Sequence, residues 1–182
     1  METLSPTARS RCREVGPAAY GILLCMDTLE VAGRTFRVAR ARAVDVPALI
    51  ALLADDVLGR GRENGAMEPY LRAFEQIDAD PHQLLVAVRD EGEQIAATVQ
   101  LTLLAGLSRG GATRLQIEAV RVDASARGTG LGSALLTWAH GWGRERGAVL
   151  AQLTTDRSRA DAHRFYERLG YEPSHVGFKR PL

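Results

Sequence analysis

The chain has 182 residues, a formal net charge of +1 and an apolar content of 46%. This length favours one domain with a substantial buried core, and the near-neutral charge disfavours nucleic acid and anionic membrane as partners. No apolar run approaches the length of a membrane span. Cys12 and Cys25 lack metal-ligand spacing, so we expect bystander thiols in a cytoplasmic protein, with no metal site and no disulfide scaffold.

Residues 1–33 are predicted to be an N-terminal extension that is ordered only in part, and residues 34–182 to form the main domain. The extension has no sustained hydrophobic period. Its apolar run around Ile22 follows several arginines, but Glu14 interrupts them and no clear cleavage site follows. A signal peptide is therefore disfavoured.

From residue 35 the pattern becomes regular. Phe36 and Val38 alternate as a first strand, and Asp45 and Pro47 mark the start of a helix whose apolar stripe ends at Val57. The next elements are expected to be a helix over residues 69–77, strands over 84–88 and 94–104 joined by a turn at 90–93, and a strand over 114–122.

A glycine-rich turn follows that strand and leads into an amphipathic helix with Leu135 and Trp138 on one face. The free N–H groups of a first helical turn form an anion site, and phosphate is its usual ligand. Arg127 stands at the mouth of the turn and can pair with a phosphate oxygen. A Walker loop is excluded because no lysine follows Gly132, and a dinucleotide fingerprint is excluded because Ser133 stands at the third glycine position.

The last third of the chain predicts a buried strand over residues 148–155 and then a helix. Ser158 is the expected cap of that helix, and Gly170 its end. The helix has an apolar face of Ala162, Phe165, Tyr166 and Leu169, and two short closing strands are expected between residue 171 and the C-terminus. These elements predict an α/β fold with a mixed sheet and helices on both faces.

Two motifs resemble the GNAT superfamily of N-acetyltransferases. The first is the Arg-x-x-Gly-x-Gly turn at Arg127, which is similar to that family's coenzyme A pyrophosphate loop, and the second is the A-x-x-F-Y-x-x-x-G-Y helix at Ala162–Tyr171. The resemblance covers residues 35–182, and residues 161–175 are also similar to the bacterial aminoalkylphosphonate N-acetyltransferases. It implies the GNAT fold with a mostly antiparallel sheet, acetyl-CoA as cosubstrate, direct transfer to a small primary amine, and a possible homodimer.

The resemblance also assigns the residues that contact coenzyme A. They are the strand residues Val120 and Val122, whose backbone would bond the pantetheine arm, the loop residues Arg127, Gly128, Thr129, Gly130, Leu131, Gly132 and Ser133, and the helix residues Arg159 and Phe165. The chain departs from the family at two positions. Ala124 replaces a common proline, and Arg159 replaces an asparagine that bonds pantetheine in many members, so Arg159 is expected to reach a coenzyme A phosphate instead.

Acetyl transfer to an amine needs a base, because an alkyl ammonium with a pKa of about 10.4 is protonated at neutral pH. Glu118 is the candidate base, since the resemblance puts an acidic residue near this place on the central strand. Two alternatives remain open. Glu118 could pair with Arg114 or Arg121 across the sheet, or Glu68, Glu75 or a backbone-held water could serve as base.

Tyr166 is the candidate acid, whose hydroxyl would protonate the leaving thiolate; the alternative is an aromatic core residue. The resemblance also implies that the backbone N–H of Val122 donates a hydrogen bond to the oxyanion. Arg60, Arg62 and His175 could engage an acidic acceptor or simply be solvated, and His163 could line its pocket. A protein N-terminus or lysine as acceptor, and a catalytically silent CoA-binding regulatory module, are the competing functions.

Overall fold

The computed structural model describes residues 27–55, 59–63 and 65–182. Its centre is a six-stranded sheet in the order β1-β2-β3-β4-β5-β6. All neighbouring strands are antiparallel except β5 and β6, which are parallel. The strands are β1 (Asp27–Val31), β2 (Arg34–Arg40), β3 (Gln83–Arg89), β4 (Ile95–Leu104), β5 (Thr113–Val122) and β6 (Ala148–Leu153).

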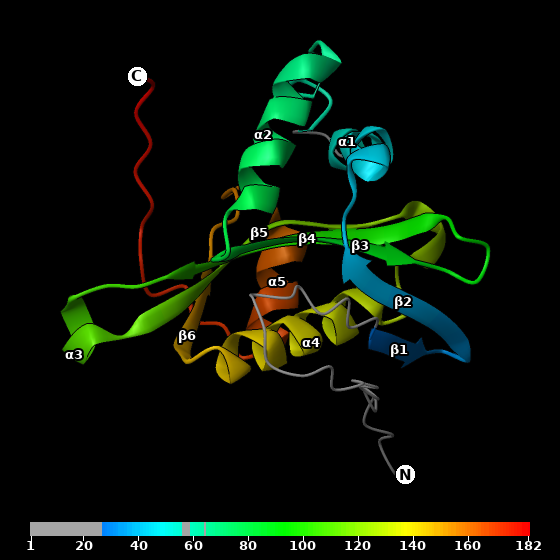
Figure 1. The fold of residues 1–182 in the computed structure, drawn as a ribbon. Coiled ribbons are helices and arrows are strands. Elements are labelled where there is room, and N and C mark those ends of the chain that lie inside the picture. The colour runs from blue at the N-terminus through cyan, green and yellow to red at the C-terminus, as the bar shows by residue number, and fades with distance from the viewer. Residues whose placement is uncertain (1–26, 56–58, 64) are drawn as a thin grey trace, which may run out of the picture.

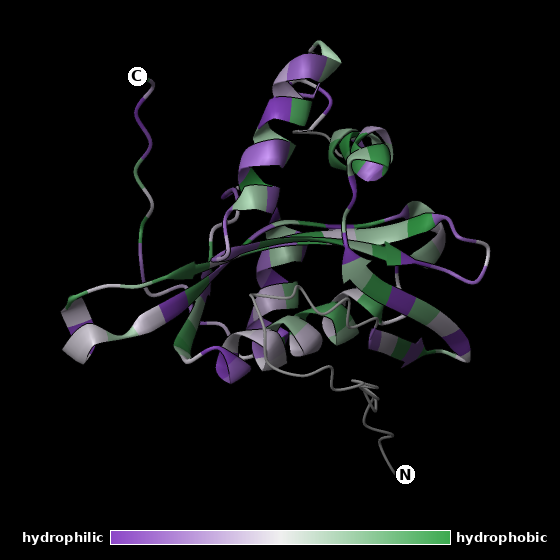
Figure 2. Ribbon diagram, in the orientation of Figure 1, coloured by the Kyte–Doolittle hydropathy of each residue, from purple (hydrophilic) through white to green (hydrophobic). Residues whose placement is uncertain are grey.

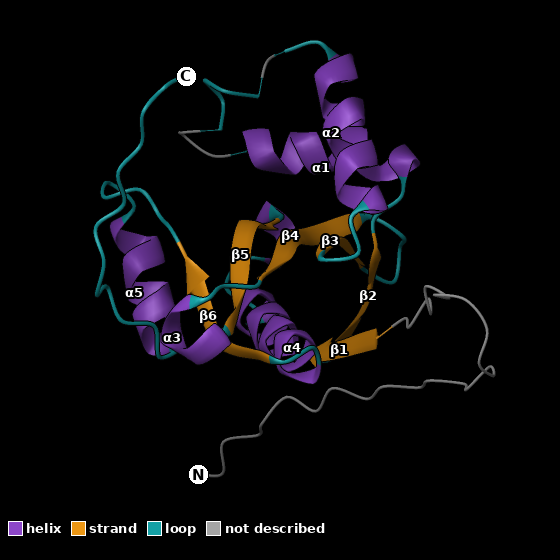
Figure 3. Ribbon diagram, turned by 60° about the vertical axis from the view of Figure 1, so that its left-hand side comes forward, coloured by secondary structure: helices purple, strands orange, loops and turns teal. Residues whose placement is uncertain are grey.

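Helices cover both faces of this sheet, which confirms the predicted α/β architecture (Figure 1, Figure 3). One face carries α1 (Val46–Ala54) and α2 (Met67–Ala79), and the other carries α4 (Leu131–Glu145) and α5 (Ala160–Arg168). The short helix α3 (Ser108–Gly111) forms the tip of the β4–β5 hairpin, and two 3-10 turns lie at Ala43–Asp45 and Ala124–Ala126.

The larger core lies between the sheet and α4. Leu131, Leu135 and Leu136 of the helix are fully buried against Leu115 and Ile117 of β5. Gly143 lets the helix approach closely, because a Cβ there would lie 2.8 Å from a methyl carbon of Leu115. Figure 2 accordingly colours the central strands mostly as hydrophobic. The predicted apolar stripe of the helix is the face that α4 buries.

A smaller core lies on the opposite face, under α1 and α2. Val46 and Leu49 of α1 and Phe74 of α2 pack on Ala87 of β3. A buried ion pair anchors this layer, since Arg89 of β3 contacts Asp45 at 2.6 Å just before α1. The apolar cover reaches β2 and β3, whereas the β4 and β5 part of the same face carries polar side chains such as Gln100 and Glu118.

Most predicted elements are confirmed, with three differences. β1 falls within the segment expected to be a partly ordered extension, and the first 26 residues and Val57 lie outside the described part of the chain. Ser158 does not cap α5; its hydroxyl donates to Asp156 at 2.7 Å, and Arg159 is the N-cap residue. Residues 171–182 contain no strand, so the two closing strands are wrong for this chain on its own.

No helix among the described residues is long and apolar enough to span a membrane. Within the same residues, no group of three or more histidine, cysteine, aspartate or glutamate side chains is arranged to hold a metal ion.

Candidate functional site

The two parallel strands at the end of the sheet, β5 and β6, separate halfway along β5. β6 pairs with β5 from Thr113 only as far as Ile117, which lies opposite Leu153. β5 continues to Val122 and there pairs with β4 alone. The outer backbone groups of its second half are therefore left without a neighbouring strand, where an extended ligand can add like another strand.

A bulge marks the point of separation. Ala119 has a φ of 52°, an unusual value for a residue with a side chain, and the β4–β5 register shifts here. Beyond the bulge, the N–H of Asp123 donates to Ala96 O at 2.8 Å. Because ladder bonds alternate along an antiparallel strand, Val122 directs its own N–H and C=O away from β4, toward the open side.

Arginine side chains donate hydrogen bonds to the carbonyls of Val120 and Val122. Val122 O accepts from Arg127 Nε at 3.0 Å, and Val120 O accepts from Arg121 at 2.8 Å. The sequence predicted that the N–H and C=O groups of both valines were available for pantetheine amides. In the structure the Val122 N–H faces the open side, whereas both carbonyls accept from arginine side chains that a pantetheine amide would have to displace.

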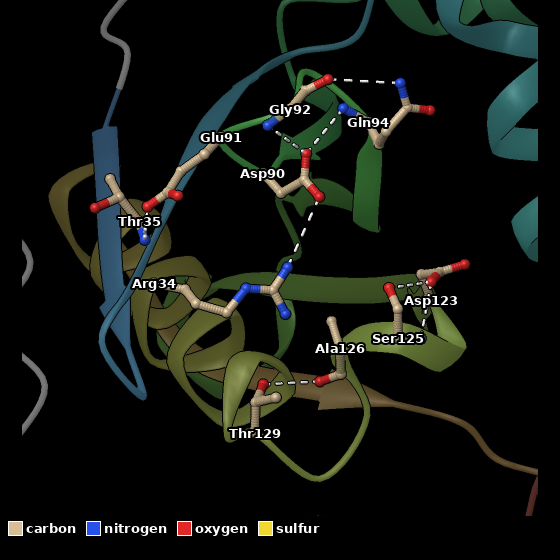
Figure 4. A network of polar contacts seen from close by, with 10 residues as sticks. All are labelled: Arg34, Thr35, Asp90, Glu91, Gly92, Gln94, Asp123, Ser125, Ala126 and Thr129. Carbon is tan, nitrogen blue, oxygen red and sulfur yellow. Dashed lines mark hydrogen bonds and ion pairs between the residues drawn. The ribbon is translucent and has the colours of Figure 1, made fainter.

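The glycine turn is held in shape by its own polar groups (Figure 4). Gly128 and Gly130 adopt φ values of 76° and 99°, which an L side chain would resist. Thr129 Oγ1 donates to Ala126 O at 2.7 Å, and the Asp123 carboxylate accepts from the N–H and the hydroxyl of Ser125 just upstream. These bonds fix the turn before any ligand arrives.

Two hairpin tips lie beside this turn (Figure 4). Arg34, at the start of β2, contacts Asp90 at 3.7 Å and lies over the ring of Phe36. Asp90 also accepts from the N–H groups of Gly92 and Gln94, which closes the β3–β4 turn. The ion pair therefore ties the β1–β2 hairpin to the β3–β4 hairpin near the candidate site.

Most amides of the glycine turn have no protein acceptor. Leu131 N donates weakly to Thr129 Oγ1, at 3.3 Å, and Ala134 N makes the first helical bond, to Gly130 O. Among the described residues, no acceptor meets the N–H groups of Gly128, Gly130, Gly132 or Ser133. Orphan donors at a helix start, added to the helix dipole, favour an anion.

Arg127 is less available than the sequence predicted. Its guanidinium pairs with Asp55 at 2.6 Å, at the end of α1, while its Nε bonds Val122 O. Both side chains of the pair are about half exposed. A phosphate in the turn would therefore compete with Asp55 for this arginine.

Phe165 and Gly132 connect the turn to α5. A Cβ on Gly132 would lie 3.4 Å from Phe165 Cζ and 3.6 Å from a Val122 methyl carbon. The missing side chain therefore allows β5, the turn and α5 to meet at one point. Three residues that the resemblance assigned to the coenzyme thus lie together.

Tyr166 lies beside Phe165, with its ring edge-on at a centroid distance of 5.2 Å. Burial raises the pKa of its hydroxyl above the usual value, and the charges of Arg159 and Arg121 oppose part of that rise. The hydroxyl has no hydrogen-bond partner among the described residues. A protonated and unpaired hydroxyl is suited to donate a proton or a hydrogen bond to a ligand.

Tyr171 and His140 form a pair that the sequence did not predict. Tyr171 packs edge-on against Tyr166, and its hydroxyl lies 2.6 Å from His140 Nε2. Burial raises the pKa of Tyr171 to about 12 and lowers the pKa of His140. Tyr171 is therefore the donor and a neutral imidazole the acceptor at pH 7.

Glu118 is exposed and points to the face of the sheet that carries α1 and α2, because its neighbour Ile117 is buried on the α4 face. Within the described residues no ion pair joins it to Arg114 or Arg121, so the structural alternative is not seen. No contact joins Glu118 to Tyr166 either. A substrate would have to lie between these two side chains if both act on it.

Two other observations concern residues that sequence reasoning missed or left open. Asp55 could not be recognised from spacing, because it is 72 positions from Arg127. Hydrogen bonds from Ser158 are the main cause that lowers the pKa of Asp156, in the β6–α5 loop, and the charges of Arg62 and Lys179 add to it, so two basic groups from distant segments lie near that loop.

Comparison with known proteins identifies the family. The model of the family described as "Acetyltransferase (GNAT) family" matches residues 50–171. The chain therefore belongs to the GNAT acetyltransferase family.

Three relatives illustrate the similarity. An aminoalkylphosphonate N-acetyltransferase from Salmonella typhimurium is 45% identical over 67 residues, which is 37% of this chain and 44% of that protein, so the match spans less than half of the curated relative. The structure of a transcriptional regulator from Bacillus halodurans is 41% identical with a TM-score of 0.76, over 81% of this chain and 99% of that one. Glucosamine-6-phosphate N-acetyltransferase from Arabidopsis thaliana, at 22% identity over 80% of this chain and 97% of that one, has a TM-score of 0.67 and shares the fold.

Proposed function

We propose that this protein is an acetyl-CoA-dependent N-acetyltransferase that transfers acetyl directly to a primary amine of a small molecule. The observation that carries the proposal is the open second half of β5 beside a turn with unpaired amides. An extended thioester arm can lie along such a strand edge while its diphosphate occupies the turn.

The coenzyme contacts follow from this arrangement. The amides of Gly128, Gly130, Gly132 and Ser133 would bind the diphosphate, with Arg127 exchanging Asp55 for a phosphate oxygen. The remaining assigned residues, Thr129, Leu131 and Arg159, would support the turn or add charge near the ligand. Phe165 would pack against the arm where it passes Gly132.

The chemistry needs three steps that these residues can assist. Glu118 removes a proton from the ammonium, directly or through water, and the freed nitrogen attacks the thioester carbonyl carbon. The Val122 N–H, which points to the open side, donates to the resulting oxyanion. The carbon–sulfur bond then breaks, Tyr166 protonates the leaving thiolate, and the nitrogen returns its extra proton to the tyrosinate, which gives an acetamide and free coenzyme A.

The acceptor class rests on the relatives and on local charge. The curated relative's name specifies an aminoalkylphosphonate, an amine that carries an anionic group. Arg62 and Lys179 lie within electrostatic reach of the β6–α5 loop, so cations are available on that side to meet such a group. A protein N-terminus or lysine side chain is the alternative acceptor.

The same proposal includes the partners and location expected from the sequence. They are a small amine as substrate, a homodimer, and a cytoplasmic location without nucleic acid or membrane partners. The net charge of +1 supports the last point, since it provides no general attraction to polyanions.

Thiol release from acetyl-CoA over a panel of amines tests the proposal. The panel contains aminoalkylphosphonates, amino acids, polyamines and short peptides. We expect turnover with at least one small amine, and Glu118→Gln should lower kcat by about 100-fold while leaving the Kd for acetyl-CoA unchanged. The matched control is Glu75→Gln on α2, which should keep full activity; a loss there instead would move the base to α2.

A second function has one specific observation in its favour. The Bacillus halodurans relative is described as a transcriptional regulator, which supports a catalytically silent CoA-binding module. Calorimetric binding of acetyl-CoA without turnover on any amine in the panel would establish that module and contradict the enzyme.

A further inference from the structure

A row of polar side chains crosses the sheet beside Glu118, on the face that carries α1 and α2. Gln116 lies two residues before Glu118 on β5, and Gln100 lies opposite Glu118 on β4. Side chains two residues apart on a strand share a face, and those of paired residues are about 5 Å apart at Cβ. Both glutamines are half-buried, whereas Glu118 is exposed. The candidate base therefore has an amide side chain on each of two sides.

The orientation of the Gln116 amide is fixed by a chain of hydrogen bonds that begins at Arg114. The Arg114 guanidinium donates to Gln152 Oε1 at 3.2 Å, and Gln152 Nε2 donates to Gln116 Oε1 at 2.7 Å. A guanidinium can only donate, so Gln152 must turn its oxygen to Arg114 and its NH2 group to Gln116. The oxygen of Gln116 is thereby engaged as an acceptor. Among the described residues, no acceptor meets the NH2 group of Gln116, so this group is available to a ligand.

A second chain of hydrogen bonds fixes Gln100 in the opposite sense. Asp80, just after α2, accepts from Gln83 Nε2 at 3.0 Å, and Gln83 Oε1 accepts from Gln100 Nε2 at 3.0 Å. The hydrogen bonds from Gln83 and from the His82 N–H hold the pKa of Asp80 below its usual value, so at neutral pH it is a carboxylate that can only accept. Within the described part of the chain, no donor meets Gln100 Oε1. This chain therefore ends on an available acceptor.

The Gln116 end of the row is positively charged. In the described ranges of the chain, no carboxylate pairs with Arg114, and its Nε is buried without an acceptor. Its paired residues on β4 and β6, Leu104 and Leu150, are apolar. The charge of Arg114 also polarises the hydrogen-bonded amides, which strengthens Gln116 as a donor. A ligand group beside Gln116 is therefore expected to be an anion.

We propose that Gln100 and Gln116 select the acceptor, an inference that rests on the proposed N-acetyltransferase function. Gln100 Oε1 accepts an N–H of the amine held at Glu118, and the NH2 group of Gln116 donates to an anionic group further along the same molecule. Residues two apart on a strand are separated by about 7 Å, which an amine and an anion joined by about two or three carbon atoms can span. The positioning residues, which act through the two glutamines, are Asp80, Gln83, Arg114 and Gln152.

The direction of the row agrees with the proposed place of the coenzyme. The open half of β5 leads from Glu118 to Val122, whereas Gln116 lies on the other side of Glu118. An amine at Glu118 can therefore face a thioester on the open half while its anionic group points away from it. The anion of the acceptor and the diphosphate in the glycine turn then lie at opposite ends, which lowers the repulsion between them.

Matched acceptors test the two glutamines. The anionic amines 2-aminoethylphosphonate and β-alanine are compared with propylamine, which has no anionic group. Gln116→Leu should lower kcat/KM for both anionic amines at least about tenfold and for propylamine less than about twofold. Gln100→Leu should lower it for all three amines by a similar factor, because Gln100 contacts the nitrogen that they share. Gln76→Leu, at an exposed position of α2, is the control and should change none of them. An unchanged ratio of anionic to neutral amine in Gln116→Leu would overturn the proposal.

Gln152→Glu tests the positioning chain through a residue that does not contact the acceptor. A glutamate there would pair with Arg114 and accept from the NH2 group of Gln116, so Gln116 would turn its oxygen to the acceptor. The preference for anionic amines should then fall at least about tenfold, and 1,3-diaminopropane should become the better substrate. Gln76→Glu adds the same charge on α2 and should keep the original order. An equal loss for all acceptors would mean a structural role only and would contradict the proposed chain.

Calorimetry distinguishes a failure of this proposal from a failure of the proposed function. Each anionic amine is titrated into the protein with coenzyme A present, where no acetyl group can be transferred. If the protein turns over no amine but Gln116→Leu weakens this binding at least about tenfold, the enzyme is contradicted and the binding site is retained. Absence of binding by both amines would overturn the site. So would binding that Arg62→Gln weakens and Gln116→Leu does not, since the anion would then lie at the β6–α5 loop.

Discussion

The two halves of β5 differ in what surrounds them, although one strand forms both. The first half, up to Ile117, has strands on either side and buries Leu115 and Ile117 almost completely. The second half has only β4 beside it, and from Glu118 onward every side chain is exposed or half-buried. A single strand thus supplies rigidity at one end and unpaired backbone at the other. The first half should control stability, and the second half ligand binding and catalysis.

The largest expected effect is a loss of stability from the first half. Ile117→Ala removes a fully buried side chain and should lower the free energy of unfolding by about 2–5 kcal/mol, as such cavities do. Val122→Ala, in the second half, should cost less than half as much because Val122 is only half-buried. Urea denaturation measures both. Equal costs would contradict the division of β5 into two halves.

Tyr166→Phe tests the catalytic side of the comparison. Loss of a general acid typically costs 10²-fold or more, so kcat should fall about 100-fold while acetyl-CoA affinity stays within about twofold. Because burial raises the pKa of Tyr166, the hydroxyl keeps its proton throughout the neutral range, and activity should not decline there on its account. A parallel loss of affinity and kcat would assign Tyr166 to packing alone.

The bulge between the halves should resist enlargement of its side chain. Ala119 sits at a φ of 52°, where a β-branched residue is strained, so Ala119→Val should destabilise the fold by about 1–2 kcal/mol. Ala119→Gly relieves the strain and should be close to neutral, because glycine also loses more entropy on folding. Thermal unfolding of both variants measures this. If packing rather than backbone strain controlled stability at this position, Ala119→Gly would be the more destabilised of the two variants.

The pair of Tyr171 and His140, beside the first half, should make stability depend on pH at both ends. The folded pKa of Tyr171 is raised to about 12, so its contribution is complete below pH 10 and is lost as pH rises from 10 to 12. The folded pKa of His140 is lowered, so its contribution is present above about pH 6.5 and is lost as pH falls below it. Tyr171→Phe should flatten the alkaline limb in urea titrations, and an unchanged limb would contradict the burial of this hydroxyl.

The smallest expected effect concerns the arginine of the glycine turn. Asp55→Asn removes a half-exposed ion pair, which should change stability by less than about 1 kcal/mol. It frees Arg127 from its carboxylate, so acetyl-CoA should bind a few-fold more tightly at low salt, and less so as ionic strength rises. Calorimetry at two salt concentrations measures this. Weaker binding would mean that Asp55 positions Arg127 for the ligand.

Local patterns in the sequence were enough for most of the fold. Hydrophobic alternation and helical spacing predict β2 to β6 and the longer helices, and the Arg-x-x-Gly-x-Gly pattern around Gly130 predicts the turn by its resemblance to a coenzyme A loop. Failures arose where a local signal competed with a neighbour. Serine is a common N-cap residue, but the hydroxyl of Ser158 donates to Asp156 two residues earlier. The N-cap of α5 is Arg159 instead.

The sequence by itself determined the turn, the helix behind it and the chemical character of Glu118 and Tyr166, because backbone preference and side-chain type are properties of short segments. Only the tertiary structure decided that Arg127 meets Asp55, that β6 leaves β5 after Ile117, and that the C-terminal segment has no strand to join. Those features depend on which distant groups compete for the same partner. Such competition is decided by the packing of the whole chain and cannot be predicted from the periodicity of its sequence.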